Sequence, residues 1–142
     1  MDWRGGGARA DISTRQAAVI GLTFDTGALI ALERRRQRIS RVYTTAVADG
    51  LTVTVPAVVL SEWWRRRSDA REIVLRGVRV ELVDAVLAKS AGEALAAVKG
   101  ATAIDALVMA SAARRGDVVY TSDFDDLDKL RGYFPTVRVL AV

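Results

Sequence analysis

The chain contains no histidine and no cysteine in its 142 residues. Without cysteine, it can form no disulfide framework and carry out no thiolate chemistry. Without histidine, Ser-His-Asp and Cys-His catalysis, zinc binding by HExxH motifs and histidine acid–base catalysis are excluded. Any catalysis must therefore depend on carboxylates, hydroxyls, Lys or Arg, or on a metal held by oxygen ligands.

Long apolar segments are also missing. No apolar run is long enough to span a membrane, and the N-terminal stretch MDWRGGGARADISTRQ lacks the continuous apolar core of a signal peptide. We therefore expect a cytoplasmic protein. Gly5, Gly6 and Gly7, with charges on both sides, predict a flexible basic leader over residues 1–16. A mis-set start site and a basic arm remain alternatives for this leader.

Apolar residues and arginine are abundant. Apolar residues make up 51% of the chain, and its length suits one domain with a core of useful size. The net charge is +4, with 18 Arg and 3 Lys. A basic chain favours phosphate-rich partners, and Arg forms bidentate phosphate contacts better than Lys. A genome-wide bias toward Arg explains the same excess equally well.

Apolar, β-rich runs alternate along the chain with segments of helical periodicity. Strands are predicted at 17–24, 51–55, 78–83, 117–121 and 136–142. Helices are predicted at 27–36, 41–50, 56–67, 69–77, 85–98 (partly broken at Gly92) and 103–116, with a loop and a short helix at 122–132. This alternation predicts one α/β domain over residues 17–142, built on a parallel sheet with both faces covered.

Four acidic residues are expected at one edge of that sheet. Ligands of open parallel sheets bind beyond the carboxyl ends of the strands. Asp25 directly follows the first predicted strand, and Asp123 follows the fourth by two residues. Asp105 starts the helix leading into the fourth strand, and Glu62 lies about a turn and a half into the helix after the second. We therefore expect the four carboxylates to converge.

Each of these acids also has a purely structural explanation. Asp25 is a typical helix N-cap, and Asp105 can complement a helix dipole. Asp123 can belong to a solvated loop and helix start together with Asp125, Asp126 and Asp128. Glu62 is harder to explain in this way. In PAVVLSEWW it shares the helical stripe of Val58 and Val59, where an unpaired carboxylate would be costly, although a surface pair with Arg66 is the alternative.

A divalent cation would account for all four acids. Facing carboxylates raise one another's pKa unless a cation lies between them. Oxygen ligands suit Mg²⁺ or Mn²⁺ rather than zinc, and a metal-activated water can attack phosphorus in line. The arginines at 34–38 and 65–67 are expected on helices that begin at the same edge, and are candidates for holding a phosphate backbone. A solvated basic face is the alternative.

Four stretches carry a resemblance when taken in order: FDTGALIAL, PAVVLSEWW, AIDALVMASAARRG and VVYTSDFDDL. They resemble the PIN-domain family and, more closely, the VapC-type toxins of bacterial toxin–antitoxin pairs. The resemblance covers residues 18–142. It implies an α/β fold, a PIN-like three-layer α/β/α sandwich around a parallel sheet of about five strands.

The resemblance also implies a Mg²⁺- or Mn²⁺-dependent endoribonuclease that forms a homodimer and is inhibited by a cognate antitoxin protein. The catalytic, metal-binding acids of the family correspond to Asp25, Glu62, Asp105 and Asp123. Asp125 or Asp126 takes the place of a further metal-binding acid. Thr121 and Ser122 match a small polar pair before the fourth acid. Gly27 departs from the family, where a Ser is common.

Other functions remain open on the same residues. A non-catalytic module that binds nucleic acid or protein is the main alternative, since fold does not fix function. Phosphoryl transfer through an aspartyl nucleophile, as in haloacid-dehalogenase-like phosphatases, requires an acid where Gly27 stands. Walker A and GxGxxG motifs are absent. At least one of Trp63 and Trp64 is expected in the core, and the other at a dimer or antitoxin interface.

Overall fold

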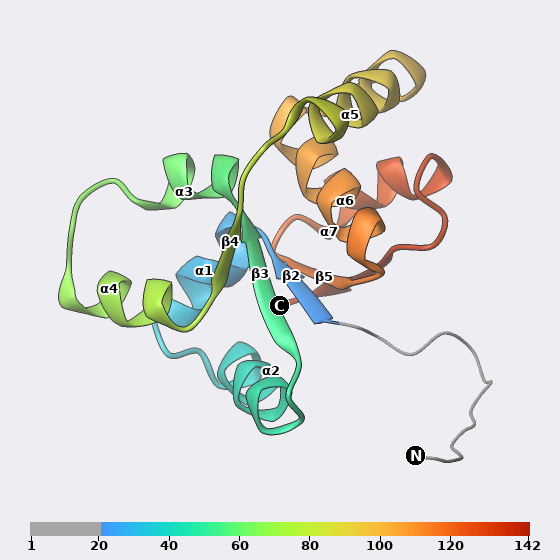
Figure 1. Ribbon diagram of the computed structural model, residues 1–142. Helices are drawn as coiled ribbons and strands as arrows, with labels where there is room; N and C mark the ends of the chain where they lie inside the picture. Colours follow the sequence, from blue (N-terminus) through green and yellow to red (C-terminus); the bar gives the residue numbers. More distant parts are fainter. Residues whose placement is uncertain (1–20) are drawn as a thin grey trace, which may run out of the picture.

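The computed structural model describes residues 21–142 (Figure 1). The predicted leader, 1–16, and the first residues of the first predicted strand, 17–20, lie outside the described residues. The strands are β2 (Gly21–Phe24), β3 (Thr52–Pro56), β4 (Arg79–Glu81), β5 (Val118–Thr121) and β6 (Arg138–Ala141). They form one all-parallel sheet in the order β4-β3-β2-β5-β6.

Helices connect the strands and cover both faces of the sheet. They are α1 (Thr26–Glu33), α2 (Gln37–Ala48), α3 (Ala57–Trp63), α4 (Asp69–Arg76), α5 (Ala85–Ala97), α6 (Ala103–Arg115), α7 (Phe124–Asp128) and the 3₁₀-helix η1 (Lys129–Gly132). None of the helices formed by residues 21–142 is both long and apolar enough to cross a membrane.

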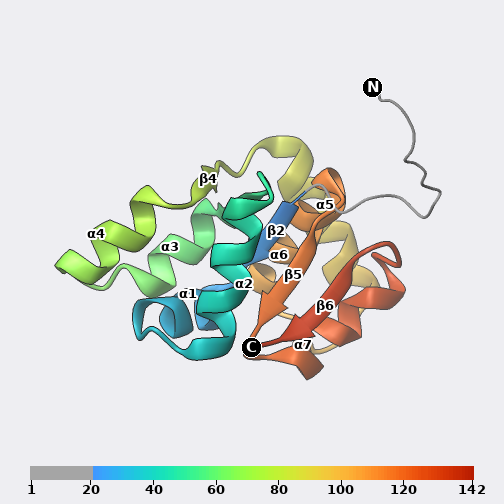
Figure 2. The same ribbon diagram turned by 90° about the horizontal axis from the view of Figure 1, so that it is seen from below.

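The layers follow from the helix contacts. Helices α1 and α2 lie on one face of the sheet, and α6 lies on the other, where α5 packs on its outer side (Figures 1 and 2). The central strands β2 and β5 are buried along nearly their whole length, which explains their continuous apolar runs. Phe24, Val55 and Val119 are completely buried between the layers. The predicted three-layer α/β/α sandwich is confirmed.

Several helix ends differ from the sequence prediction. Pro56 ends β3 instead of opening α3. The predicted break at Gly92 was wrong, because α5 is continuous from Ala85 to Ala97. A glycine inside a helix costs only about 1 kcal/mol, and Leu87, Ala91 and Ala94 of the same helix are buried. Gly116 closes α6 in the left-handed conformation, φ 77°, at the predicted position.

The two arginine runs lie outside the helices to which they were assigned. Helix α3 ends at Trp63, so residues 65–67 lie in the following loop, where Arg65 Nε donates to the Glu62 carbonyl at 2.8 Å. Residues 34–36 form the turn between α1 and α2. The backbone N–H of Arg36 donates to Ala31 O at 2.9 Å, and Arg35 has φ 56°. This is a Schellman ending with Arg where Gly is usual, a conformation that costs about 1–2 kcal/mol.

The tryptophan pair divides as expected. Trp63 is only 2% exposed, and its Nε1 donates to Glu33 Oε1 at 2.9 Å. Trp64 is half-buried and meets the Trp63 ring edge-on, with ring centroids 5.8 Å apart. The prediction that at least one of the two belongs to the core is therefore confirmed, and Trp64 is the one that keeps exposed surface.

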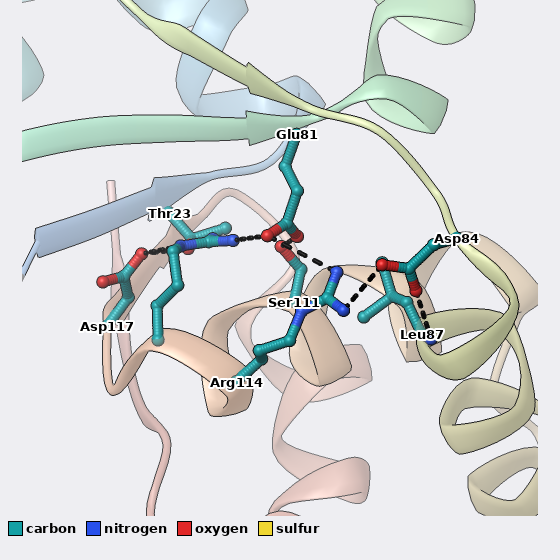
Figure 3. Close-up of polar contacts among 8 residues, drawn as sticks. Thr23, Glu81, Asp84, Leu87, Ser111, Arg114 and Asp117 are labelled. Carbon is teal, nitrogen blue, oxygen red and sulfur yellow. Dashed lines mark hydrogen bonds and ion pairs between the residues drawn. The ribbon is translucent and has the colours of Figure 1, made fainter.

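A network of charged side chains ties the C-terminal end of α6 to the sheet (Figure 3). Arg115 pairs with Asp117 at 2.9 Å and with Glu81 at 2.6 Å, and its Nη2 donates to Thr23 Oγ1 at 2.7 Å. Ser111 donates to Glu81 at 2.7 Å, and Arg114 pairs with Asp84 at 2.9 Å. Because these partners come from β2, β4 and the approach to β5, the network fixes where α6 lies.

Candidate functional site

Asp25 is the centre of the candidate site. It follows β2 directly, caps the N-terminus of α1 and is 8% exposed. Its Oδ1 accepts a hydrogen bond from the Ala28 N–H at 2.9 Å, and its Oδ2 accepts one from the Thr121 hydroxyl. The capping explanation for Asp25 is thus correct, but capping uses only one of its oxygens. The other faces the end of the neighbouring strand β5.

The environment of Asp25 opposes its ionised form. Burial raises the pKa of Asp25 to about 6, against an ordinary value of 3.8. The hydrogen bonds from Thr121 and Ala28 lower this pKa, whereas the negative charges of Asp123 and Asp105 raise it. A buried carboxylate next to two other carboxylates is poised to gain from a nearby cation.

Asp105 belongs to the same cluster. It lies in the first turn of α6, where Thr102 caps the helix by accepting from the Asp105 N–H at 3.1 Å. Burial raises the pKa of Asp105, a hydrogen bond with Thr102 lowers it, and the charges of Asp126, Asp123 and Glu62 raise it further. The negative charges of Asp123 and Asp105 act on Asp25, and those of Asp123 and Glu62 act on Asp105, so the four acids lie within electrostatic reach of one another. Of the two further candidates, Asp126 is the one whose charge acts on Asp105.

Glu62 contacts the residue that follows Asp25. The predicted shared stripe with Val58 and Val59 was wrong, because Glu62 is exposed. In the short helix α3 the buried positions are Val59 and Trp63, which leaves Glu62 beside the apolar stripe and removes the expected cost of burial. Its Oε1 accepts from the Thr26 hydroxyl at 2.6 Å, one residue after Asp25. No local sequence pattern marks Thr26 as a partner of Glu62.

Thr121 connects the acids of the two central strands. Its buried hydroxyl donates to Asp25 and accepts from the Asp123 N–H at 2.8 Å. Because β2 and β5 are neighbours, this one side chain sets the relative positions of Asp25 and Asp123. The sequence marked Thr121 only as part of a small polar pair.

The donor set suits a hard divalent cation. Every candidate ligand is a carboxylate or hydroxyl oxygen, which Mg²⁺ and Mn²⁺ prefer and zinc does not. In their present side-chain positions, no three acids of residues 21–142 approach closely enough to form a complete ligand set. Each oxygen of Asp25 accepts one hydrogen bond, which leaves a second lone pair on each oxygen for a cation.

Gly27 and Ser122 interlock beside the acids. A Cβ added at Gly27 would lie 1.8 Å from Ser122 Oγ and 2.5 Å from Ser122 Cβ. The Ser122 side chain therefore fills the space that a side chain at position 27 would occupy. Gly27 lacks the serine hydroxyl that is common at this position in the family that the sequence resembles. The hydroxyl of Ser122, in the segment after β5, lies in that space instead.

This interlock makes a double-mutant prediction. Gly27→Ala should destabilise the protein by about 1–3 kcal/mol, as overpacked sites do, and should displace Ser122 together with Asp123. Adding Ser122→Gly removes the colliding atoms, so the double variant should recover most of the lost stability. Urea unfolding of the four proteins measures the coupling. If the stability losses of the two single variants simply add in the double variant, the two positions do not share this space.

The raised pKa of Asp25 makes a pH prediction for the metal-free protein. Between pH 4 and 6 the folded state keeps a proton that the unfolded state has released, so this group's contribution to stability falls as pH rises. One pKa unit corresponds to about 1.36 kcal/mol. The free energy of unfolding of Asp25→Asn should therefore exceed that of wild type by up to about 3 kcal/mol above pH 6, and should equal it near pH 4. Asn also caps helices well.

Urea unfolding in EDTA at pH 4 and pH 7.5 measures this difference. Asp128→Asn is the matched control, because Asp128 is exposed and pairs only with Arg131 among the described residues. Mg²⁺ should raise the stability of wild type and so reduce the difference in free energy of unfolding between wild type and Asp25→Asn. If the difference in free energy of unfolding between the two proteins did not change with pH, the raised pKa of Asp25 would be contradicted.

The chain is similar to known proteins in sequence and in structure. The family described as PIN domain matches residues 22–133. A search of curated proteins gave no match. The chain is similar in structure to DNA-bound VapBC from Salmonella typhimurium, with 18% identity, a TM-score of 0.66 and coverage of 87% of this chain and 98% of that one.

Two further solved structures show the same fold. FitAcB from Neisseria gonorrhoeae is 19% identical, with a TM-score of 0.57 over 84% of this chain and 96% of that one. FitAB bound to an IR36 DNA fragment is 18% identical, with a TM-score of 0.54 over 84% and 94%. At these identities the likeness concerns the fold, which extends over nearly the full length of each matched chain.

Proposed function

This chain belongs to the PIN domain family, and we propose that it is a Mg²⁺- or Mn²⁺-dependent endoribonuclease, the toxin of a toxin–antitoxin pair. The observation that supports the proposal is that Asp25 follows β2, Asp123 follows β5 and Asp105 lies in the first turn of α6, and that burial and the negative charges of neighbouring acids raise the pKa of Asp25 and Asp105. Such a cluster is costly without a cation.

We assign the metal to Asp25, Glu62, Asp105 and Asp123, with Asp126 as the auxiliary acid and Asp125 as its alternative. A bound Mg²⁺ or Mn²⁺ supplies Lewis-acid activation for phosphodiester hydrolysis. The protein's part is orientation: the Ala28 N–H and Thr121 hold Asp25, Thr26 holds Glu62, and the Thr121 hydroxyl holds the backbone at Asp123. With no histidine in the chain, these oxygen groups are its means of hydrolysis.

Structured RNA incubated with the purified protein tests this activity. Cleavage should require Mg²⁺ or Mn²⁺ and stop in EDTA. Mapping of RNA ends after brief expression would then identify the substrate and cleavage site. Activity that survives EDTA would contradict the metal-dependent mechanism. Salt-sensitive RNA binding without divalent-stimulated cleavage would favour a binding module instead.

We also propose a cognate antitoxin as partner. The similar structures include VapBC and FitAB assemblies, which supports a second protein bound to this chain. A Lys or Arg of that protein, placed among the acids, would take the position of the cation. Basic-to-Ala changes in the antitoxin tail should therefore weaken inhibition, and unchanged inhibition would count against this role.

A homodimer and a cytoplasmic location belong to the same proposal, with Trp64 as the candidate interface residue.

A further inference from the structure

A pocket lies along one face of α1, beside the acid cluster. Gly27, Ile30, Ala31 and Arg34 follow one another at helical spacing and line it from one end to the other. Ser122 closes it at the Gly27 end, next to Asp123. Its volume is about 330 Å³, within the range of about 300–1,000 Å³ that small-molecule sites occupy. We call it the arginine pocket.

The far end of the arginine pocket is basic. Arg34, Arg36 and Arg38 line it, and all three are exposed. The left-handed backbone at Arg35 reverses the chain, so that Arg34 and Arg36, from opposite sides of the turn, line the same pocket. Arg38 is braced there, because its Nε donates to Ala141 O at 3.1 Å at the end of β6. Arg34 and Arg36 pair with no acid among residues 21–142.

The remaining walls of the arginine pocket are aliphatic. Ile30 and Ala31 of α1, Ile39 of α2 and Val142 provide them. In Figure 2 the C-terminal end of the chain lies next to α1 and α2, as the Arg38 contact requires. A site that is aliphatic inside and cationic at its rim suits a ligand with a flat body and a phosphate, since unstacked bases stack on Arg guanidinium planes and can pack against apolar side chains.

We propose that the arginine pocket binds the RNA nucleotide that flanks the scissile phosphate, with its base against the aliphatic walls and its phosphate on Arg34 and Arg36. This inference rests on the proposed function for the identity of the ligand. From Gly27 to Arg34 the pocket extends about 10 Å along the helix axis. One end therefore lies next to the acids and the other at the arginines. The antitoxin is a poorer occupant, because the basic group proposed for the acids would be repelled by these arginines.

Chemical shifts of the backbone amides test the pocket without any need for cleavage. The four ribonucleoside 5′-monophosphates, titrated together into the full-length protein, should shift the amides of Gly27, Ile30, Ala31 and Val142 in a saturable way. Inorganic phosphate should shift them much less, because it offers no base. Equal effects of phosphate alone would reduce the pocket to an anion site and overturn the proposal, as would shifts confined to other regions.

Paired variants separate local contacts from overall charge. Arg34→Gln/Arg36→Gln should weaken nucleotide binding at least about tenfold, as expected for the loss of charged hydrogen bonds. Arg76→Gln/Arg79→Gln removes the same charge from exposed positions on α4 and β4 and should change affinity less than about twofold. Equal weakening by the two pairs would overturn the proposal.

The same variants can be tested in the RNA cleavage assay. There, Arg34→Gln/Arg36→Gln should raise KM and leave kcat nearly unchanged, since the acids are untouched. Variants that keep nucleotide affinity and normal KM but escape antitoxin inhibition would assign the pocket to the antitoxin instead. If wild type binds nucleotides as described but cleaves no RNA, the pocket stands and the proposed nuclease activity fails. The two ideas can therefore be judged separately.

Discussion

Asp25→Asn is expected to lower RNA cleavage by more than about a hundredfold, because even the outer partners of metal ligands contribute about 10- to 100-fold. The neutral amide holds a divalent cation poorly. It can still accept the Ala28 N–H at the start of α1, so the fold should survive. Asp105→Asn should act in the same direction.

The stability of the same variant makes this result informative. Asp25→Asn should be at least as stable as wild type at neutral pH without metal, because burial opposes the Asp25 charge. Loss of activity can then not be ascribed to unfolding. Asp128→Asn, which removes an exposed acid paired with Arg131, should cleave RNA normally. Unchanged cleavage by Asp25→Asn would contradict its assignment as a metal ligand.

Arg115→Ala is expected to destabilise the protein by about 3–5 kcal/mol, the usual cost of removing one partner of a buried ion pair. It leaves Asp117, which is 3% exposed, without its cation, and leaves Glu81 with only the longer pair to Arg114 at 3.5 Å. Because Arg115 ties α6 to the sheet, its loss should also loosen the helix that carries Asp105. Urea unfolding at pH 7 measures the change.

Two comparisons control for this effect. Arg131→Ala breaks an exposed pair with Asp128 and should cost less than about 1 kcal/mol. Adding Asp117→Asn to Arg115→Ala removes one of the stranded charges and should restore part of the stability. Equal costs for Arg115→Ala and Arg131→Ala would show that the network in Figure 3 does not anchor α6.

The sequence was sufficient for the fold and for the placement of Asp25 and Asp123 at the ends of neighbouring strands. Buried parallel strands give continuous apolar runs such as VVYT, and helices between them require a parallel sheet. Parallel strands end at one edge, so an acid after β2 and another after β5 both lie at that edge. These inferences need only local patterns and topology, which the sequence carries directly.

The remaining features depend on contacts between distant residues. Helical spacing placed Glu62 with Val58 and Val59, but it could not show that α3 ends at Trp63 and buries a different face. The Thr121 hydroxyl bridges Asp25 and Asp123 only because β2 and β5 are neighbours.

The space above Gly27 and the turn at Arg35 are further cases. Ser122 fills the position of a missing side chain 95 residues earlier in the chain, which no local pattern records. Arg35 adopts a left-handed conformation that favours glycine, so its residue type argued against the turn that it forms. In both cases, packing outweighs local preference.

The central claim, that these acids form a divalent-cation site, is tested most directly by titrating Mn²⁺ into the wild-type protein and following paramagnetic broadening of its backbone amides. The account predicts saturable broadening centred on Ala28, Asp105 and Asp123, and its loss in Asp25→Asn. Broadening centred elsewhere in the protein, or unchanged by Asp25→Asn, would contradict it.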